Sequence, residues 1–585
     1  MKRSINIACT LMMIIAMVMF TGGFSVSNHV VAESLSKKQV DSSTIPDHTI
    51  RIHYKRADQN YDDWGLWLWN DVAIPSAEAG VWPTGATPFS NAQVDENGAY
   101  VDVELIEAPT SISFIVVNRS TGEKDGDAKV FAQFGEYKEV FITEGDDFVY
   151  TSPDGSSNVE KSKTFHPNWS KDSTIYEVNV RQYTPEGTFK AFESHLPRLK
   201  ELGVEILWFM PIHPISSEGR IGTLGSYYAI QDYKAINPEF GTLDDFKRLV
   251  EKAHSMGFKV MLDWVGNHTG KDHIWIENKE WYTLDNEGNI THPPGTNWLD
   301  VADLNYNNTE MRTAMIDAMK YWVSETDIDG YRADYAVGVP LDFWETARKE
   351  LNKIKPVYML AEDNTVYNLL DHAFNSNYGW ELNHIMRDIA IGNRDATHVK
   401  SYISKMERLY PSGSYPMHWT TNHDDNSWEG TTSELFGESE KTMAALTFTL
   451  PGMPLIYSGQ EAGLNKRLAF FDKDEISWQD LSDQKFYQDL IRLKKENKAL
   501  WNGDAGGEIN LLDTSDENIL AFERQKGNSK VMVIVNLSGD PISGSVTVDS
   551  KSVGNYHLFP SKETVSIENK QPFDLEPWGY HILVK

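Results

Sequence analysis

The chain has 585 residues, of which 40% are hydrophobic and 24% charged, and its formal net charge is −31. The length corresponds to three or four domains of ordinary size, and the composition excludes global disorder, collagen-like repeats and coiled coil. A surface this acidic repels phosphate backbones and anionic lipid head groups, so we expect neither nucleic acid nor a membrane surface as a partner.

The first 32 residues have the pattern of a secretory signal peptide. Lys2 and Arg3 precede an apolar run that ends at Phe20, and a small-residue cleavage site ends at Ala32. The run is short for a bilayer-spanning helix, so we expect secretion without a stable membrane anchor, with an uncleaved anchor as the alternative. The single cysteine, Cys9, lies in this segment, so the mature chain has no disulfide, thiolate metal site or cysteine nucleophile.

The segment 47–152, between polar linkers at 33–46 and 153–169, predicts a β-sandwich. Its strand-like stretches are short and separated by turn residues. They are HTIRIHYKR, GLWLWND, YVDVELI, SISFIVVNR and EVFITEG.

From residue 170 onward strands alternate with helices. The predicted strands are STIYEVNV, VEILWFMPI, FKVMLDWV, IDGYRADYA, PVYMLAED, DHAFNSNY, MHWTTNHDD and PLIYSGQE. Helices are predicted over 188–203, ending at Gly203, over 242–257, opened by a capping pair of Thr242 and Asp245, and over 309–325. Eight such strands favour an α/β fold, a (β/α)₈ TIM barrel over 170–504, although periodicity alone leaves an open doubly wound sheet as an alternative.

Two further regions complete the predicted organisation. Residues 268–308 separate the third strand from its helix, and a loop this long in a barrel predicts a small inserted domain that forms one wall of a cleft. From 505 to 585 the pattern returns to strands and predicts a C-terminal β-domain.

Polar side chains gather at the ends of the predicted barrel strands, where barrel enzymes keep their catalytic groups. The clusters are Asp263 to His268, Arg332 with Asp334, Glu362 with Asp363, and His423 with Asp424 and Asp425. The period of a strand places Arg332 and Asp334 on one face, where the guanidinium favours the ionised carboxylate. A structural ion pair, solvated acids and structural histidines are the alternative interpretations of these clusters taken one at a time.

Without a cysteine or a glycine-rich phosphate loop, the chemistry available is that of carboxylates. Two of them suffice to cleave a glycosidic bond, because one attacks while ionised and the other donates a proton to the leaving oxygen. A third stabilises the cationic transition state.

Four segments resemble the signature regions of the α-amylase superfamily of glycoside hydrolases, in the family's order. They are DWVGNH (263–268), GYRAD (330–334), LAED (360–363) and TNHDD (421–425). Residues 226–246 and VADLN (301–305) resemble two further family motifs, and the resemblance extends from about 170 to 585. It implies the same barrel, with a domain B after the third strand and a C-terminal β-domain.

The resemblance also implies roles for individual residues. Asp334 corresponds to the nucleophile, Glu362 to the general acid/base and Asp424 to the transition-state stabiliser; the choice over Asp363 and Asp425 rests on the resemblance alone. The residues that correspond to the central sugar subsite and its support are Tyr228, as the stacking ring, Asp232, Asp263, His268, Arg332 and His423.

The chain departs from the family after the nucleophile. Many classical α-amylases carry a Lys-His pair where Val337-Gly338 stands here, which puts the usual +2 subsite contact and the standard calcium arrangement in doubt. Asn267 and Asp303 match calcium-ligand positions of the family, and their oxygen atoms suit that ion. Calcium is therefore the one cofactor we expect, with no organic cofactor.

The N-terminal segment resembles the starch-binding module that accompanies pullulanases. Trp67 and Trp69 share one strand face, which predicts a stacking platform for a glucan, with a buried aromatic core as the alternative. Lys124 and Asp127 are the predicted hydroxyl-binding partners. A pullulanase is expected to carry YNWGYD early in its catalytic domain, and this chain has no such string.

We therefore predict a secreted, retaining α-glucan hydrolase that cleaves α-1,4 bonds in starch and maltooligosaccharides. A neopullulanase- or pullulanase-like hydrolase and a transglycosylase are the alternatives within the family. A glucan-binding protein with an inactive barrel is the alternative from another class, and the presence of all three carboxylates argues against it.

Overall fold

The computed structural model describes residues 45–90, 93–107, 109, 112–131, 134, 137–146, 149–153 and 165–585. The predicted signal peptide lies outside these residues, together with most of the first linker and much of the second. Within the described ranges, no helix has both the length and the apolar character needed to cross a membrane.

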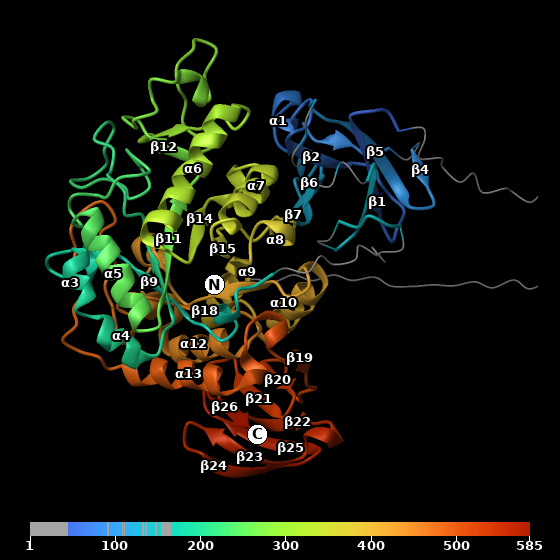
Figure 1. Cartoon of the computed structure of the whole chain (residues 1–585). Coiled ribbons are helices and arrows are strands. Elements are labelled where there is room, and N and C mark those ends of the chain that lie inside the picture. The colour runs from blue at the N-terminus through green and yellow to red at the C-terminus, as the bar shows by residue number, and fades with distance from the viewer. Residues whose placement is uncertain are drawn as a thin grey trace, which may run out of the picture.

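The N-terminal part is a sandwich of two four-stranded sheets, ordered β4-β5-β1-β8 and β3-β2-β6-β7 (Figure 1). Its elements are β1 (Thr49–Lys55), β2 (Trp64–Asn70), α1 (Ser76–Ala79), β3 (Thr87–Pro88), β4 (Val94–Asp95), β5 (Gly98–Glu104), β6 (Ile112–Asn118), β7 (Lys124–Phe131) and β8 (Glu139–Thr143). Alternate apolar residues such as Ile52, Leu66 and Val116 are buried between the sheets and form a core of their own. Arg408, on a barrel helix, donates a hydrogen bond to the hydroxyl of Tyr150 and so joins this part to the barrel.

Eight parallel strands close into a barrel in the order β10-β11-β14-β15-β16-β17-β18-β9. They are β9 (Ile175–Val178), β10 (Ile206–Phe209), β11 (Lys259–Val265), β14 (Gly330–Asp334), β15 (Tyr358–Ala361), β16 (Ser376–Tyr378), β17 (Tyr415–His418) and β18 (Met453–Tyr457). Each overlaps a segment that the sequence predicted as a strand; β17 begins two residues before its predicted segment and β18 one residue before. Closure excludes the open doubly wound sheet, so the predicted fold class is confirmed.

Helices surround the barrel. They are α2 (Val180–Tyr183), α3 (Phe189–Glu193), α4 (Leu196–Leu202), α5 (Leu243–Ser255), α6 (Thr309–Thr326), α7 (Leu341–Asn352), α8 (Leu369–His372), α9 (Trp380–Ala390), α10 (Ala396–Leu409), α11 (Thr432–Phe436), α12 (Glu440–Thr449) and α13 (Gln484–Glu496). The capping box of Thr242 and Asp245 opens α5 as predicted.

The single helix predicted over 188–203 is wrong, because the chain forms α3 and α4 there instead. Pro197 lies in the first turn of α4. It has no N–H to donate to the carbonyl of Glu193, so one continuous helix is interrupted at this point. Gly203 ends α4 in the left-handed region, with φ of 103°, as the sequence predicted.

The long loop after β11 carries a small antiparallel pair, β12 (His268–Gly270) and β13 (Val301–Asp303), in which His268 lies opposite Asp303. Figure 1 shows this region at one end of the barrel and the C-terminal sheets at the other. Because β12 follows directly from β11, the inserted region stands beside the carboxyl ends of the strands.

The C-terminal part contains a six-stranded sheet, β19-β20-β21-β26-β23-β24, and a two-stranded sheet of β22 and β25. The strands are β19 (Glu508–Leu511), β20 (Ile519–Lys526), β21 (Ser529–Asn536), β22 (Ile542–Thr547), β23 (Gly554–Phe559), β24 (Glu563–Ile567), β25 (Lys570–Leu575) and β26 (Tyr580–Val584). Phe522 and Val533 belong to the same buried cluster as the barrel helices. The buried Arg524 donates to the carbonyls of Thr449 and Leu450, at the end of α12, both at 3.1 Å.

Candidate active site

Arg332 joins three carboxylates at the carboxyl ends of neighbouring strands. Its Nη1 lies 2.9 Å from Asp263 Oδ1, on β11, and 2.9 Å from Asp334 Oδ1, on its own strand. Its Nη2 lies 2.7 Å from Glu362 Oε1, just beyond β15, and its Nε donates to the hydroxyl of Tyr378, on β16, at 3.0 Å. Arg332 and Asp334 therefore share a strand face, as the period of the strand predicted.

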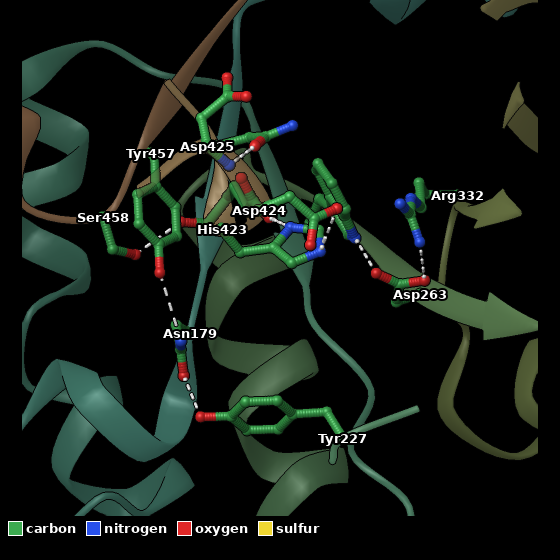
Figure 2. Close-up of polar contacts among 12 residues, drawn as sticks. Asn179, Tyr227, Asp263, Arg332, His423, Asp424, Asp425, Tyr457 and Ser458 are labelled. Atoms are coloured by element: carbon green, nitrogen blue, oxygen red, sulfur yellow. Dashed lines mark hydrogen bonds and ion pairs between the residues drawn. The ribbon is translucent and has the colours of Figure 1, made fainter. Parts of the chain in front are cut away.

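A second polar chain connects this cluster to the end of β17. The Tyr228 hydroxyl donates to Asp263 Oδ2 at 3.1 Å and lies 2.7 Å from His423 Nε2. On its other side, His423 Nδ1 lies 2.5 Å from Glu177 Oε1, and Asp424 Oδ2 lies 3.4 Å from Nε2. Figure 2 shows Asp263 facing Arg332, with His423 beside Asp424.

The buried charges perturb one another. Burial raises the pKa of Glu362; the negative charges of Asp334 and Asp424 add to the effect, while Arg332 opposes it. Burial and the Asp334 charge likewise raise the pKa of Asp263. The site therefore holds Glu362 protonated at a pH where an ordinary glutamate is ionised, which is what a general acid requires.

His423 is held in its charged form. Burial lowers the pKa of this imidazole, but the charges of Asp424 and Glu177 outweigh burial and raise it to about 10. A protonated ring donates from both nitrogens, to Glu177 on one side and towards Tyr228 on the other. His423 is therefore a cation held in place between the carboxylates of Glu177 and Asp424.

In each of the two pairs of adjacent acids, the structure gives the two members different partners. Glu362 contacts Arg332, whereas the carboxylate of Asp363 accepts hydrogen bonds from the backbone of the loop that follows it, at 2.7 and 2.9 Å. Asp424 contacts His423, whereas Asp425 lies 2.5 Å from Arg387 and is buried. Glu362 and Asp424 are therefore the members of each pair that face the cluster.

Aromatic side chains extend from the cluster in two directions. The ring of Tyr228 is stacked on Phe470, with 6.1 Å between centroids and 12° between planes, and Phe470 lies 5.1 Å from Trp428. From the inserted region, Trp298 lies 5.5 Å from Tyr335, edge to face. Trp298 and Trp428 are 36% and 51% exposed, so both rings are accessible to a ligand.

The two positions expected to bind calcium lie beside His268. Asp303 faces His268 across the β12–β13 pair, and Asn267 Nδ2 lies 3.3 Å from His268 Nδ1. Calcium takes about 6–8 oxygen ligands, and across the described ranges no three His, Cys, Asp or Glu side chains are grouped to hold a metal. Calcium binding at Asn267 and Asp303 therefore stays a prediction.

The carboxylate of Asp232 accepts a hydrogen bond from the backbone N–H of Lys234 at 2.8 Å, so this residue stabilises a local turn. Sequence reasoning missed Glu177, Trp208 and Tyr378. Trp208 donates to the same Asp263 oxygen as Tyr228, at 3.2 Å. Glu177 could have been found from its position, because a carboxylate inside the apolar strand IYEV is unusual. Trp208 and Tyr378 gave no such signal.

In the N-terminal sandwich, Leu66 and Leu68 are buried while Trp67 and Trp69 remain partly exposed, the alternation that the sequence predicted. Trp67 packs edge to face on Trp82, with 5.0 Å between centroids, and Trp82 is 41% exposed.

The polar partners predicted for this face both fall on β7, which the sequence did not predict as a strand. Lys124 Nζ lies 5.7 Å from the centre of the Trp82 ring, at cation–π distance. Asp127 lies on the same strand, and its side chain is outside the described part of the chain.

A closed (β/α)₈ barrel with carboxylates, an arginine and a charged histidine at its strand ends defines a hydrolase of the glycoside hydrolase class. Comparison with known proteins narrows this class. The chain matches the alpha-amylase catalytic domain over residues 143–289 and 296–502, and the bacterial pullulanase-associated domain over 48–151. The chain belongs to the α-amylase family of glycoside hydrolases.

Relatives and solved structures agree with this assignment. The alpha-amylase MalA of Haloarcula japonica is 28% identical over 430 residues, which cover 69% of this chain and 61% of that protein. The noncanonic maltogenic alpha-amylase AmyB of Thermotoga neapolitana is 29% identical, with a TM-score of 0.66 over 71% of this chain and 99% of that one. An alpha-amylase of Lactobacillus plantarum is also 29% identical, with a TM-score of 0.64 over 72% of this chain and 100% of that one.

Proposed function

We propose that the protein is a secreted, retaining α-glucan hydrolase that cleaves α-1,4 bonds in starch and maltooligosaccharides. The observation that carries this proposal is the single guanidinium of Arg332, which holds both Asp334 and Glu362. Two carboxyl groups that contact one guanidinium are near neighbours, which favours the closely spaced pair of a retaining enzyme over an inverting pair, which leaves room for a water molecule.

In the first step, an oxygen of the Asp334 carboxylate attacks the anomeric carbon, the bond to the leaving oxygen breaks, and Glu362 gives its proton to that oxygen. Arg332 contacts and orients the Asp334 carboxylate, and Asp424 stabilises the positive charge that develops on the sugar ring. Tyr228, His268 and His423 surround the central sugar, and the ring of Tyr228 provides the stacking surface.

In the second step, Glu362 takes a proton from water while the water oxygen attacks the anomeric carbon and releases Asp334. The electrostatics support this change of role. Asp334 carries no charge while it is esterified, so one of the two negative charges that raise the pKa of Glu362 is absent in the intermediate. Glu362 is then a better base than in the free enzyme.

The N-terminal module would hold the polymer near the barrel. Trp67, Trp69 and Trp82 offer aromatic faces to a glucan, and Lys124 and Asp127 are its proposed hydroxyl-binding partners. Secretion rests on the N-terminal sequence pattern, and a starch-degrading enzyme with such a module acts on polymers found outside the cell.

A pullulan-degrading activity is the second candidate. The match to the pullulanase-associated domain favours it, and relatives named neopullulanase 2, from Thermoactinomyces vulgaris, and cyclomaltodextrinase are 26% and 24% identical to this chain. Transfer to a sugar instead of water remains a third candidate, since a relative named cyclomaltodextrin glucanotransferase is 27% identical.

The test is to incubate the purified protein separately with soluble starch and with pullulan and to follow reducing ends and product sizes. Starch breakdown with pullulan untouched supports the α-amylase proposal, whereas release of panose or maltotriose from pullulan assigns the second candidate. Asp334→Asn should fold normally and lose turnover; a variant with near wild-type activity would overturn the assignment of the nucleophile.

A further inference from the structure

We propose that Trp298 and Tyr335 form the platform on which the leaving-group sugar stacks, in place of the charged contact that the sequence lacks at Val337-Gly338. This inference rests on the proposed function, because it requires a glycosidic bond to be cleaved between Asp334 and Glu362. It adds two residues that determine which leaving groups, and which acceptors, the enzyme takes.

The position of Tyr335 defines the side of the site. Its backbone N–H donates to Glu362 Oε2 at 2.7 Å, so the residue directly adjoins the proposed general acid. A general acid lies beside the oxygen that it protonates, and that oxygen belongs to the leaving sugar. The ring of Tyr335, 37% exposed, therefore lies where the leaving group emerges.

The backbone of Tyr335 is held in an unfavourable conformation. Its φ is +41°, a value that a bulky residue without a local hydrogen-bonding side chain rarely adopts. Such strain persists where the surroundings fix it, and it is concentrated at functional sites. Here it occurs at the residue whose N–H donates to Glu362.

Gly338 provides the space that the ring occupies. A Cβ built on Gly338 would lie 2.5 Å from two ring atoms of Tyr335 and 2.3 Å from Asn267 Oδ1. A side chain at position 338 would therefore force the Tyr335 ring to move. Gly338, which stands where the family has the histidine of its Lys-His pair, therefore leaves room for the Tyr335 ring.

Trp298 completes the platform from the inserted region. Its ring lies 5.5 Å from Tyr335, edge to face, and 5.4 Å from His268. It is 36% exposed, so part of a large apolar ring is in contact with water and available to a ligand. The planes of the two rings are 84° apart, so a sugar between His268 and the general acid can stack on the face of one ring while the other ring flanks it.

The test compares two substrates with different leaving groups. When maltopentaose is cleaved, the leaving group is a sugar. When α-maltosyl fluoride is cleaved, the leaving group is fluoride, which needs neither the platform nor a proton. For Trp298→Ala we expect kcat/KM on maltopentaose to fall about tenfold, the factor that corresponds to about 1.4 kcal/mol of lost stacking. We expect kcat/KM on the fluoride to stay at the wild-type value.

Two further variants separate stacking from damage to the loop. Trp298→Phe keeps an aromatic ring and should recover most of the activity on maltopentaose. Leu299→Ala alters the neighbouring side chain, which is 62% exposed, and should behave as wild type. Circular dichroism and thermal unfolding confirm that each variant is folded.

The outcomes distinguish this inference from the proposed function. An equal loss on both substrates, no loss on either, or a Phe variant as impaired as the Ala variant would overturn the platform. A wild-type protein that cleaves neither substrate would instead overturn the proposed function, and the inference with it.

Discussion

Replacing Arg332 by methionine gives a sharp test of the buried charge cluster. The guanidinium is fully buried and contacts Asp263, Asp334 and Glu362. Burial already raises the pKa of Asp263 and Glu362, so without the cation the excess negative charge is removed by uptake of a proton. The folded wild type already keeps Glu362 protonated, so we expect the folded variant to bind about one proton more than the folded wild type, while both unfolded chains have their carboxylates ionised at neutral pH.

The extra proton makes the free energy of unfolding depend on pH. A folded state that binds one more proton than the unfolded state loses about 1.4 kcal/mol of unfolding free energy for each unit rise in pH. Between about pH 6 and about pH 8, the gap between the wild type and Arg332→Met should therefore widen by about 3 kcal/mol. Urea titrations of the barrel transition, followed by tryptophan fluorescence, measure this gap.

Arg332→Lys is the matched control. Lysine cannot reproduce the fork that reaches three carboxylates, so this variant should also lose stability, but it keeps the positive charge. Its curve of stability against pH should therefore run parallel to that of the wild type. If the curve for Arg332→Met also runs parallel, the cluster takes up no proton and the electrostatic reasoning is refuted.

Three further variants test other parts of the molecule. Glu362→Gln should lower kcat/KM on starch by about 10³-fold but leave kcat/KM on α-maltosyl fluoride much less affected, because this quantity reports the first step, in which fluoride leaves without a proton; equal losses of kcat/KM on both would contradict its role as the acid. Asp329, whose pKa falls to about 2 because His254 and Lys355 outweigh the opposing effect of burial, should contribute about 2 kcal/mol at neutral pH. Asp329→Asn should show that loss near pH 7, and the gap should close as the pH falls from about 5 to about 2; a constant gap would show that no pKa shift underlies it. Trp67→Ala should reduce retention on amylose and leave hydrolysis of maltotriose unchanged, whereas unchanged retention would remove Trp67 from the glucan site.

The strands of the barrel were predictable because each is a short apolar segment between clear turn signals. The helix over 188–203 was not, because the pattern of apolar residues continues through Pro197 and masks the break that its missing N–H imposes. Strand β7 was missed because GEKDGD has the composition of a turn, and only its pairing with β6 makes it a strand.

At the site, strand periodicity correctly placed Arg332 beside Asp334, but no local rule could distinguish Glu362 from Asp363. That distinction depends on which carboxylate faces the barrel axis, and the answer came from contacts between residues far apart in the chain. The pairing of Trp298 with Tyr335 depends on such a contact too, between the inserted region and the end of β14.

The cores of the two β-rich parts have a consequence for how such a gene can be rearranged. The N-terminal sandwich encloses its own apolar cluster, so recombination can add, remove or exchange it while the barrel remains intact. Phe522 and Val533 share the barrel's cluster, and Arg524 supplies donors to carbonyls at the end of α12. The C-terminal sheets must therefore be inherited together with the barrel, and a shortened gene that ends before β19 would encode a barrel with exposed apolar surface and unpaired carbonyls.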